Sequence, residues 1–344
     1  MSSFEINEDL LEALDEYHVR TMLMERHHIE KIPIIGDLET EVNDDLIFNV
    51  PIYDMGSRKY AAFCSFTEAV FKKENDVKGN GEHFSHVEIT RDIDWFMLFY
   101  LFRLCGSGIN YKPNTGFDFR GTHGFGNFWI VESLLSFKFK FEEWKEDLIN
   151  LDKPFSNNKG YLLPQFSYKH LNKGHLKYFI LNDSYRLVSK LLDFCSVERR
   201  EIFQVTDYGN KCLVEMGYNR QNFVLTAFAA DLAEYFPHLV DPKSRVYAGT
   251  NAVKCIKAIF PKKKGKRIKQ FDYINDVLSF QADRYNLNPI DCEDSRNCDL
   301  VRYFQEYQSK DHIKANNGLE MKNNSILKKT WGHDKYYNFS DNLK

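Results

Sequence analysis

The chain lacks a long apolar run. Its longest uninterrupted apolar stretch, residues 95–102, is far shorter than the roughly 20 residues that a membrane-spanning helix needs. Residues 1–7 also lack the basic and apolar regions of a secretory signal peptide. We therefore expect a soluble, unprocessed protein of the cytoplasm that does not act at a membrane.

An excess of charge of one sign is also missing. The 46 Lys and Arg residues nearly balance the 49 Asp and Glu residues, so no global basic surplus steers the chain to nucleic acid. The seven cysteines include no Cys-x-x-Cys pair, which suits reduced thiols in a cytosol. The closest pair, Cys292 and Cys298, has no histidine at zinc-ligand spacing, so we expect no metal site.

Several catalytic motifs are absent as well. There is no P-loop and no Gly-x-Gly-x-x-Gly fingerprint, which disfavours P-loop kinases and dinucleotide enzymes. There is no Gly-x-Ser-x-Gly elbow and no His-Glu-x-x-His pair, so serine hydrolases and zinc peptidases lose their usual support. We expect no cofactor.

Apolar residues recur at helical spacing over most of the chain, which predicts a mainly helical fold. The predicted helices are residues 7–28 with Asn7 as the cap, 91–105, a helix ending near 136, 184–195, 197–216, 220–236, 250–260, 271–284 and 291–308. We divide the chain into an N-terminal helical half with Gly-rich loops (1–183), a C-terminal helical half (184–308) and a polar tail (309–344). The two halves are expected to form one catalytic unit.

A basic run stands out in this nearly neutral chain. Six of the eight residues from 262 to 269 are basic, and a run that dense can pair with phosphates. The alternative is a solvated loop between two helices. The candidate phosphate ligands are Lys262, Lys263, Lys264, Lys266 and Arg267.

Gly249, Thr250 and Asn251 precede the helix predicted at 250–260. Gly permits positive φ, Thr and Asn are good caps, and a helix N-terminus offers free N–H groups to an anion. An ordinary helix start explains the same residues. Because the basic run follows about ten residues later, both features are expected to contact one phosphate backbone.

Two charged residues interrupt apolar helices. Asp231 stands alone in an otherwise apolar segment and is costly to bury unpaired, so it needs either a partner or a catalytic task. Arg103 ends the apolar helix beside a Gly-rich turn, where a guanidinium can hold a phosphate or carboxylate. A structural salt bridge is the alternative for each.

Several short segments occur in a fixed order along the chain. They are 24–27, 44–50, Arg103, 124–128, Phe223 with Asp231-Leu232, 249–251, Asp291-Cys292-Glu293 and 297–303. In this order they resemble the amino acid:DNA transferases of phage thymidine hypermodification, also called alpha-glutamyl/putrescinyl-thymine pyrophosphorylases. In that family a Gly-Pro-Gly hairpin stands where this chain has 249–251.

The resemblance implies a fold related to helix-hairpin-helix DNA glycosylases, with a hairpin that grips DNA. It implies a transferase that attaches an amino acid, with serine or glycine favoured, or an amine to phosphorylated 5-hydroxymethyluracil in viral DNA. Phosphate or pyrophosphate leaves, and the product protects phage DNA from host restriction. The partner enzyme would be a 5-hydroxymethyluracil DNA kinase in the host cytoplasm.

Under this resemblance, Asp231 is the first choice for the general base and Glu293 the second. Arg103, with Arg26, would stabilise the leaving phosphate. Cys298 could add to C6 of the ring in a covalent route, although a core role is the simpler interpretation. The residues expected to form the base pocket are Asn110, Tyr111, Phe125 and Phe128.

Two other functions stay open. A base-excision glycosylase would use the same fold and Asp231, and it would release free base. A noncatalytic DNA-binding subunit would need only the hairpin and the basic run.

Overall fold

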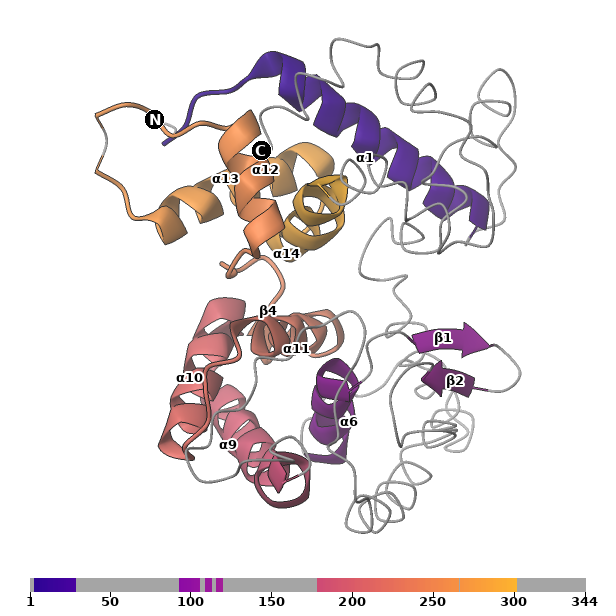
Figure 1. Ribbon diagram of the computed structural model, residues 1–344, viewed down its shortest axis with the longest axis vertical. Helices are drawn as coiled ribbons and strands as arrows, with labels where there is room; N and C mark the ends of the chain where they lie inside the picture. Colours follow the sequence, from indigo (N-terminus) through magenta and orange to yellow (C-terminus); the bar gives the residue numbers. More distant parts are fainter. Residues whose placement is uncertain are drawn as a thin grey trace. The chain divides into compact units, whose positions relative to one another are not determined.

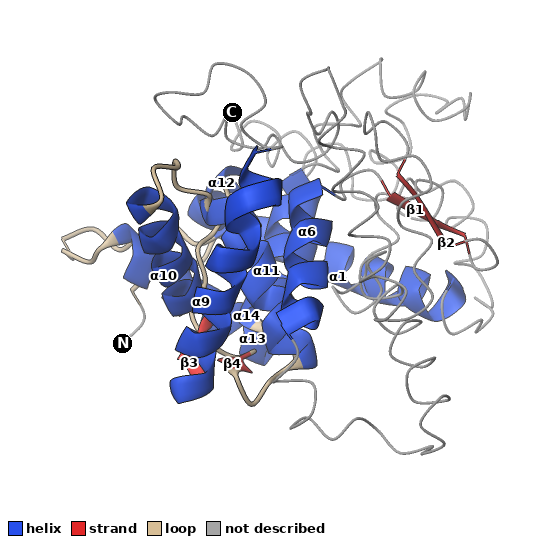
Figure 2. Cartoon of the chain, turned by 90° about the horizontal axis from the view of Figure 1, so that it is seen from below, coloured by secondary structure: helices blue, strands red, loops and turns tan. Residues whose placement is uncertain are grey.

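The computed structural model describes residues 3–28, 93–105, 109–112, 116–119, 178–265 and 267–301. Helices dominate this part of the chain (Figure 1, Figure 2), which confirms the mainly helical prediction. Contacts divide the chain into two compact units. We call Met1–Ala61 with Ala248–Lys344 the terminal unit and Ala62–Tyr247 the central unit. The boundary at 183 that we drew from sequence falls inside the central unit.

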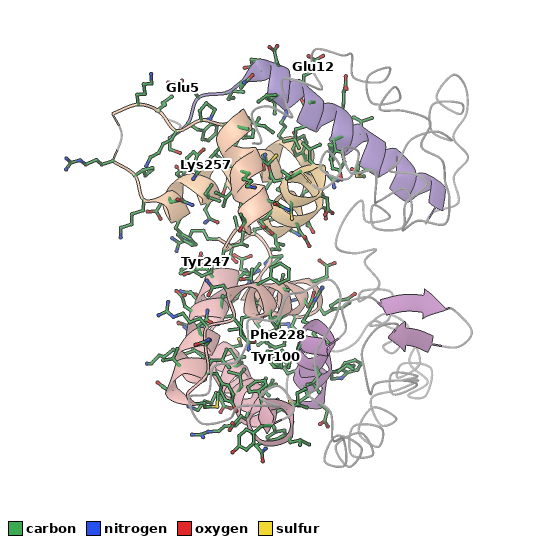
Figure 3. All side chains as sticks on the ribbon, in the orientation of Figure 1. Glu5, Glu12, Tyr100, Phe228, Tyr247 and Lys257 are labelled. Carbon is green, nitrogen blue, oxygen red and sulfur yellow. The ribbon has the colours of Figure 1, made fainter. Side chains whose placement is uncertain are left out.

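The central unit is built on helices that pack through large apolar side chains. Its helices are α6 (Ile93–Cys105), the π-helix η3 (Phe179–Asp183), α9 (Ser184–Val197), α10 (Ile202–Glu215) and α11 (Asn222–Tyr235). Helix α11 contacts both α6 and α10. Tyr100 of α6 meets Phe228 of α11 edge to face, with ring centroids 5.6 Å apart (Figure 3). Such aromatic pairs bury large apolar areas and anchor a core.

Helices α10 and α11 approach closely because small residues line their contact. A Cβ on Gly209 would lie only 2.8 Å from Cδ2 of Leu225. Beside it, the hydroxyls of Thr206 and Thr226 lie 3.2 Å apart in a buried hydrogen bond. Glycine at 209 is therefore required by space between the helices.

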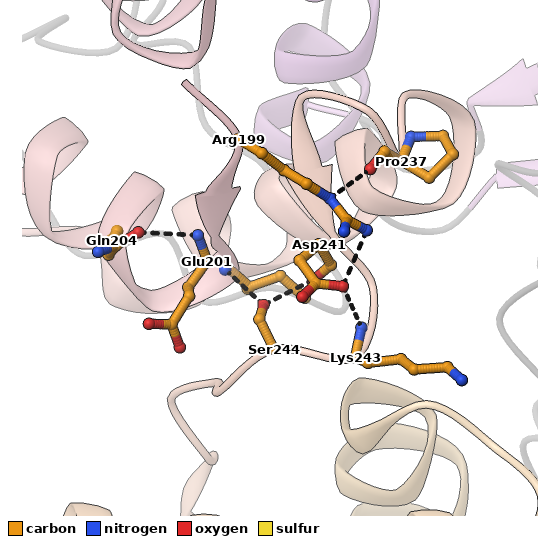
Figure 4. A network of polar contacts seen from close by, with 8 residues as sticks. Arg199, Glu201, Gln204, Pro237, Asp241, Lys243 and Ser244 are labelled. Carbon is orange, nitrogen blue, oxygen red and sulfur yellow. Dashed lines mark hydrogen bonds and ion pairs between the residues drawn. The ribbon is translucent and has the colours of Figure 1, made fainter. Parts of the chain in front are cut away.

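Helix α10 begins later than the sequence predicted. Residues 200–201 form strand β3 (Arg200–Glu201), which pairs in parallel with β4 (Val240–Asp241). The backbone N–H of Glu201 then donates to Oε1 of Gln204 at 2.9 Å, which caps the helix, and Arg199 pairs with Asp241 at 3.0 Å (Figure 4). The prediction of one helix over 197–216 was therefore wrong at its start. Residues 200 and 201 pair with a distant strand instead, so the helix can begin only after them.

An antiparallel pair of strands was also not predicted. Strands β1 (Ile109–Lys112) and β2 (Gly116–Phe119) pair antiparallel in the central unit. The predicted base-pocket residues Asn110 and Tyr111 lie on β1, opposite Asp118 and Phe117.

The terminal unit combines the beginning of the chain with its last described helices. These are α1 (Glu8–His28), α12 (Thr250–Ile259), α13 (Gln270–Tyr285), α14 (Pro289–Asp291) and the π-helix η4 (Cys292–Cys298). The predicted cap of α1 is confirmed, since Oδ1 of Asn7 accepts from the N–H of Leu10 at 3.4 Å. Helix η4 contacts α1, α12 and α13.

The predicted helix at 291–308 starts as α14 and widens into η4. Pro289 occupies the first turn of α14, where its missing N–H costs nothing. Within η4, the Nδ2 group of the buried Asn297 donates to the carbonyl of Cys292 at 2.7 Å and to Oε1 of Gln281 at 2.6 Å. π-Helical turns often mark functional sites.

Among the helices that the structure describes, none is both long and apolar enough to cross a membrane.

Candidate functional site

The structure brings Arg103 and Asp231 together inside the central unit. Nε of Arg103 donates to Oδ2 of Asp231 at 2.5 Å, and Nη2 donates to Oδ1 at 2.6 Å. Only 8% of the Arg103 side chain and 1% of the Asp231 side chain are exposed. A planar guanidinium that meets both oxygens in this way is the strongest common ion-pair geometry.

This geometry bears on the roles that the sequence suggested. Both oxygens of Asp231 accept from Arg103, so the guanidinium neutralises the charge of this carboxylate and holds it in place. The same contact occupies one edge of the Arg103 guanidinium, where a phosphate would bind. The salt bridge that we gave as the alternative for each residue is therefore present, and each is the partner of the other.

A second pair of predicted residues meets in the terminal unit. The backbone N–H of Gly249 donates to Oε1 of Glu293 at 2.7 Å, although the two residues are 44 positions apart. Glu293 is 8% exposed and belongs to η4, which packs against α12. A carboxylate at this end of a helix also interacts favourably with the helix dipole. Glu293 therefore stands at the start of α12, where the sequence predicted an anion site.

Glycine at 249 has a different reason from the one that we predicted. Its φ of −68° is ordinary, so positive φ is not the cause. A Cβ at this position would lie 3.3 Å from Oε1 of Glu293, which is a tight contact. Thr250 is the first helical residue of α12, and no described side chain caps this helix end. The close approach of Glu293 explains the glycine.

The basic run forms a loop between α12 and α13. Lys262, Lys264 and Arg267 are exposed, and Nζ of Lys262 donates to the carbonyl of Ile268. Gly265 has φ +85°, a backbone conformation that favours glycine. Both alternatives from the sequence, a solvated loop and a phosphate contact, are compatible with these exposed charges.

The basic loop and Gly249 lie at opposite ends of α12. A ten-residue helix is about 15 Å long, which corresponds to about four base-pair steps of duplex DNA. The two features therefore cannot hold a single phosphate. One nucleic-acid backbone could contact both only by running along the helix.

Cys298 lies on η4, five residues after Glu293, and is half-buried. Its Sγ and carboxylate oxygens of Asp294 and Asp299 all lie within 4.8 Å of one another. Two carboxylates and a thiol at this spacing are a possible ligand set, but exposed acidic groups commonly cluster in this way without an ion. The neighbouring Cys292 is buried, and burial raises the pKa of its thiol to about 12, which makes it a poor nucleophile.

The structure does not describe every predicted site residue. Phe125, Phe128 and Lys266 lie outside the described residues. For Arg26, Asn110 and Tyr111 only the backbone is described.

Sequence reasoning missed a buried arginine beside the Glu293 segment. Arg296 is fully buried on η4, and its Nε donates to Nδ1 of His18 on α1 at 2.8 Å. Burial, followed by the charge of Arg296, lowers the pKa of His18 to about 4, and Asp15 opposes this change. The sequence does not predict the contact between Arg296 and His18. Arginine is rarely buried, and the two residues are 278 positions apart.

Comparison of the chain with protein families, with curated proteins and with solved structures finds no match. Any functional interpretation therefore depends on the motifs and contacts described above.

Proposed function

We propose that this protein is an amino acid:DNA transferase that acts on phosphorylated 5-hydroxymethyluracil in viral DNA. The observation that carries the proposal is the hydrogen bond between Gly249 and Glu293. These residues belong to two separate segments that carry the family resemblance, and they meet at one place in the terminal unit. A contact between such segments is expected if both serve one site.

The proposed DNA-binding surface is formed by the exposed basic loop. Lys262, Lys264 and Arg267 offer charges to the phosphate backbone. At the other end of α12, Glu293 already accepts from the N–H of Gly249. A helix-hairpin-helix architecture related to DNA glycosylases is part of this proposal. The phosphorylated base would be supplied by a DNA kinase acting earlier.

Glu293 is the proposed general base. The entering amine loses a proton to the Glu293 carboxylate as its nitrogen bonds to the exocyclic methylene carbon of the base. The carbon–oxygen bond to the phosphate breaks, and phosphate leaves with the bonding electrons. This assignment replaces Asp231 as the first choice, because Arg103 holds both oxygens of that carboxylate.

A noncatalytic DNA-binding subunit is the second candidate, and the exposed basic loop is the observation that favours it. Such a subunit would need the positive charges but not the Glu293 carboxylate. A glycosylase that uses Asp231 has no comparable support, because both oxygens of that residue already accept from Arg103.

The test is mass spectrometry of nucleosides from DNA that contains phosphorylated 5-hydroxymethyluracil. The DNA is incubated with the full chain, a pool of amino acids and putrescine, and then digested. We expect a new adduct nucleoside whose mass identifies the donor. Glu293→Gln should lower its yield by about 100-fold or more, the usual contribution of a general base. Asp276→Asn, which changes an exposed carboxylate on α13, is the matched control and should retain activity.

Other outcomes would overturn the proposal in different ways. Release of free base would establish a glycosylase instead. Intact substrate together with salt-dependent binding to the same DNA would establish the binding subunit.

A further inference from the structure

The central unit carries a polar surface pocket of about 550 Å³. It is lined by Asp207, Asn210, Lys211, Val214, Glu215, Arg220 and Tyr247. The first four of these residues follow the spacing that places side chains on one face of a helix, here α10. The volume falls in the range of roughly 300–1,000 Å³ that is common for small-molecule sites.

Charges of both signs line this pocket without neutralising one another. Lys211 and Arg220 form no salt bridge with Asp207 or Glu215, and neither has an ion-pair partner elsewhere among the described residues. Glu215 pairs only loosely with Lys190 of α9, at 3.5 Å. The pocket therefore presents two cations and two carboxylates on one surface.

Hydrogen bonds fix the polar groups at two places in the pocket. The hydroxyl of Tyr247 (Figure 3) donates to Oδ1 of Asp207 at 2.7 Å. Burial and this carboxylate raise the pKa of Tyr247 to about 12, so the phenol keeps its proton and remains a donor at neutral pH. Asn210 is held by Asn222 at 2.6 Å and by the N–H of Gln221 at 2.7 Å. Groups held in place before a ligand arrives lose little entropy on binding.

We infer that this pocket binds a small zwitterion of the α-amino acid class. The ligand carboxylate would pair with Arg220 and the ligand ammonium with Asp207. Lys211 and Glu215, which follow Asp207 along α10, add one further charge of each sign to the pocket. An anion without an ammonium group would be repelled by the two carboxylates of the pocket. An amine without a carboxylate would be repelled by the two cations. The charge pattern therefore selects a ligand that carries both.

Binding of the zwitterion depends on the pocket alone. The additional statement that the bound molecule is the donor in DNA modification rests on the proposed function. The experiment below measures binding without DNA, so the two statements can fail separately.

The first step is saturation-transfer NMR of the full chain with a pool of the twenty standard L-amino acids. The amino acid with the strongest signal is then titrated by calorimetry beside two analogues, its decarboxylated amine and its 2-hydroxy acid. We expect both analogues to bind about tenfold more weakly or worse, because each loses a hydrogen bond to a charged side chain of the pocket.

Two variants locate the site. Arg220→Gln should weaken binding of the amino acid by about tenfold or more, since it removes a charged hydrogen-bond donor from the pocket. Arg186→Gln is the matched control, because Arg186 is an exposed arginine on α9 outside the pocket. Circular dichroism of both variants checks that they are folded.

The outcomes decide between sites and ligand classes. If the 2-hydroxy acid binds as tightly as the amino acid, the pocket is an anion site and the inference is wrong. Equal binding by the Arg220 and Arg186 variants, or no binding of any amino acid to the folded chain, also overturns it. If amino acid binding follows Arg220 but no DNA adduct forms with the wild-type chain, the inference stands and the proposed function fails.

Discussion

Among the described residues, each unit buries one arginine side chain, and the two surroundings differ. In the central unit, Arg103 meets the Asp231 carboxylate through two hydrogen bonds. In the terminal unit, Arg296 donates to the ring nitrogen of His18 at 2.8 Å and to the sulfur of Met22 at 3.7 Å. The first contact joins full opposite charges, whereas the second includes a neutral, titratable ring.

This difference suggests a test of stability at the Arg103 pair and a test of function at η4. The Arg103 pair joins two mainly apolar helices, and removal of either partner would leave an uncompensated buried charge, so stability is the property to test there. The η4 segment instead buries a series of polar side chains next to the start of α12. They are Glu293, Ser295, Arg296 and Asn297. Buried polar groups are costly unless they are hydrogen-bonded, so this segment is where a functional role is to be tested first.

The largest expected effect comes from breaking the central pair. Asp231→Asn leaves the buried Arg103 without its full counter-charge, and loss of one partner of a buried pair costs about 3–5 kcal/mol. We expect a fall of this size in the free energy of unfolding, measured by urea denaturation with circular dichroism. Lys190→Gln, which removes an exposed ion pair on α9, should change it by less than about 1 kcal/mol.

A small effect of Asp231→Asn on stability together with loss of DNA modification would contradict this interpretation. It would return Asp231 to the role of general base.

The contrast also shows how much the sequence could predict. Helices α1, α6 and α11 follow directly from apolar periodicity, and the cap at Asn7 follows from local hydrogen bonding. The start of α10 does not, because strand pairing between Arg200 and Val240 decides it. Local patterns therefore predicted most helices but not the points where distant segments compete with them.

The site shows the same limit. Arg103, Asp231, Gly249 and Glu293 all stand out in the sequence because each breaks a local pattern or matches a motif. Which of them pair with each other depends on contacts across 128 and 44 positions, and sequence gives no measure of those distances. The polar pocket on α10 was missed entirely, because its charged residues look like an ordinary solvated helix face.

The next comparison takes one closely packed glycine from each unit. Gly209→Ala places a methyl group 2.8 Å from Leu225, and overpacking costs about 1–3 kcal/mol, offset in part by the better helix propensity of alanine. We expect a net loss of about 1 kcal/mol or more in unfolding free energy. In a Leu225→Ala background the same change should become neutral or stabilising, because the clashing atoms are gone.

Gly249→Ala is the counterpart in the terminal unit. Its new methyl group would meet only the end of the Glu293 side chain, at 3.3 Å, and the backbone conformation suits alanine. Stability should change by less than about 1 kcal/mol, while displacement of Glu293 should lower adduct formation. Unchanged adduct formation would show that the position of Glu293 is unimportant to the chemistry.

The last expected effect is a pH dependence confined to the terminal unit. His18 faces Arg296 of η4, stacks on Tyr285 of α13 with ring centroids 4.5 Å apart, and lies one turn after Asp15, which pairs with Arg284. Burial and Arg296 lower the pKa of His18 to about 4 from an ordinary value of 6.5. The unfolded chain therefore binds a proton at a higher pH than the folded chain does.

Stability should consequently be constant above pH 6.5 and fall as the pH drops from 6.5 toward 4. Because His18 is partly exposed, we expect a loss of about 1 kcal/mol rather than the full value for such a shift. Hydrogen exchange, corrected for its intrinsic pH dependence, should show the loss in amides of α1 and α13 but not in those of α10 and α11. His18→Gln keeps an acceptor for Arg296 and removes the titration, so its stability should stay level over this range. If the stability of the variant falls over this range in parallel with that of the wild type, the titration of His18 is not the cause. The contrast between the surroundings of Arg103 and Arg296 would then have no effect on pH dependence.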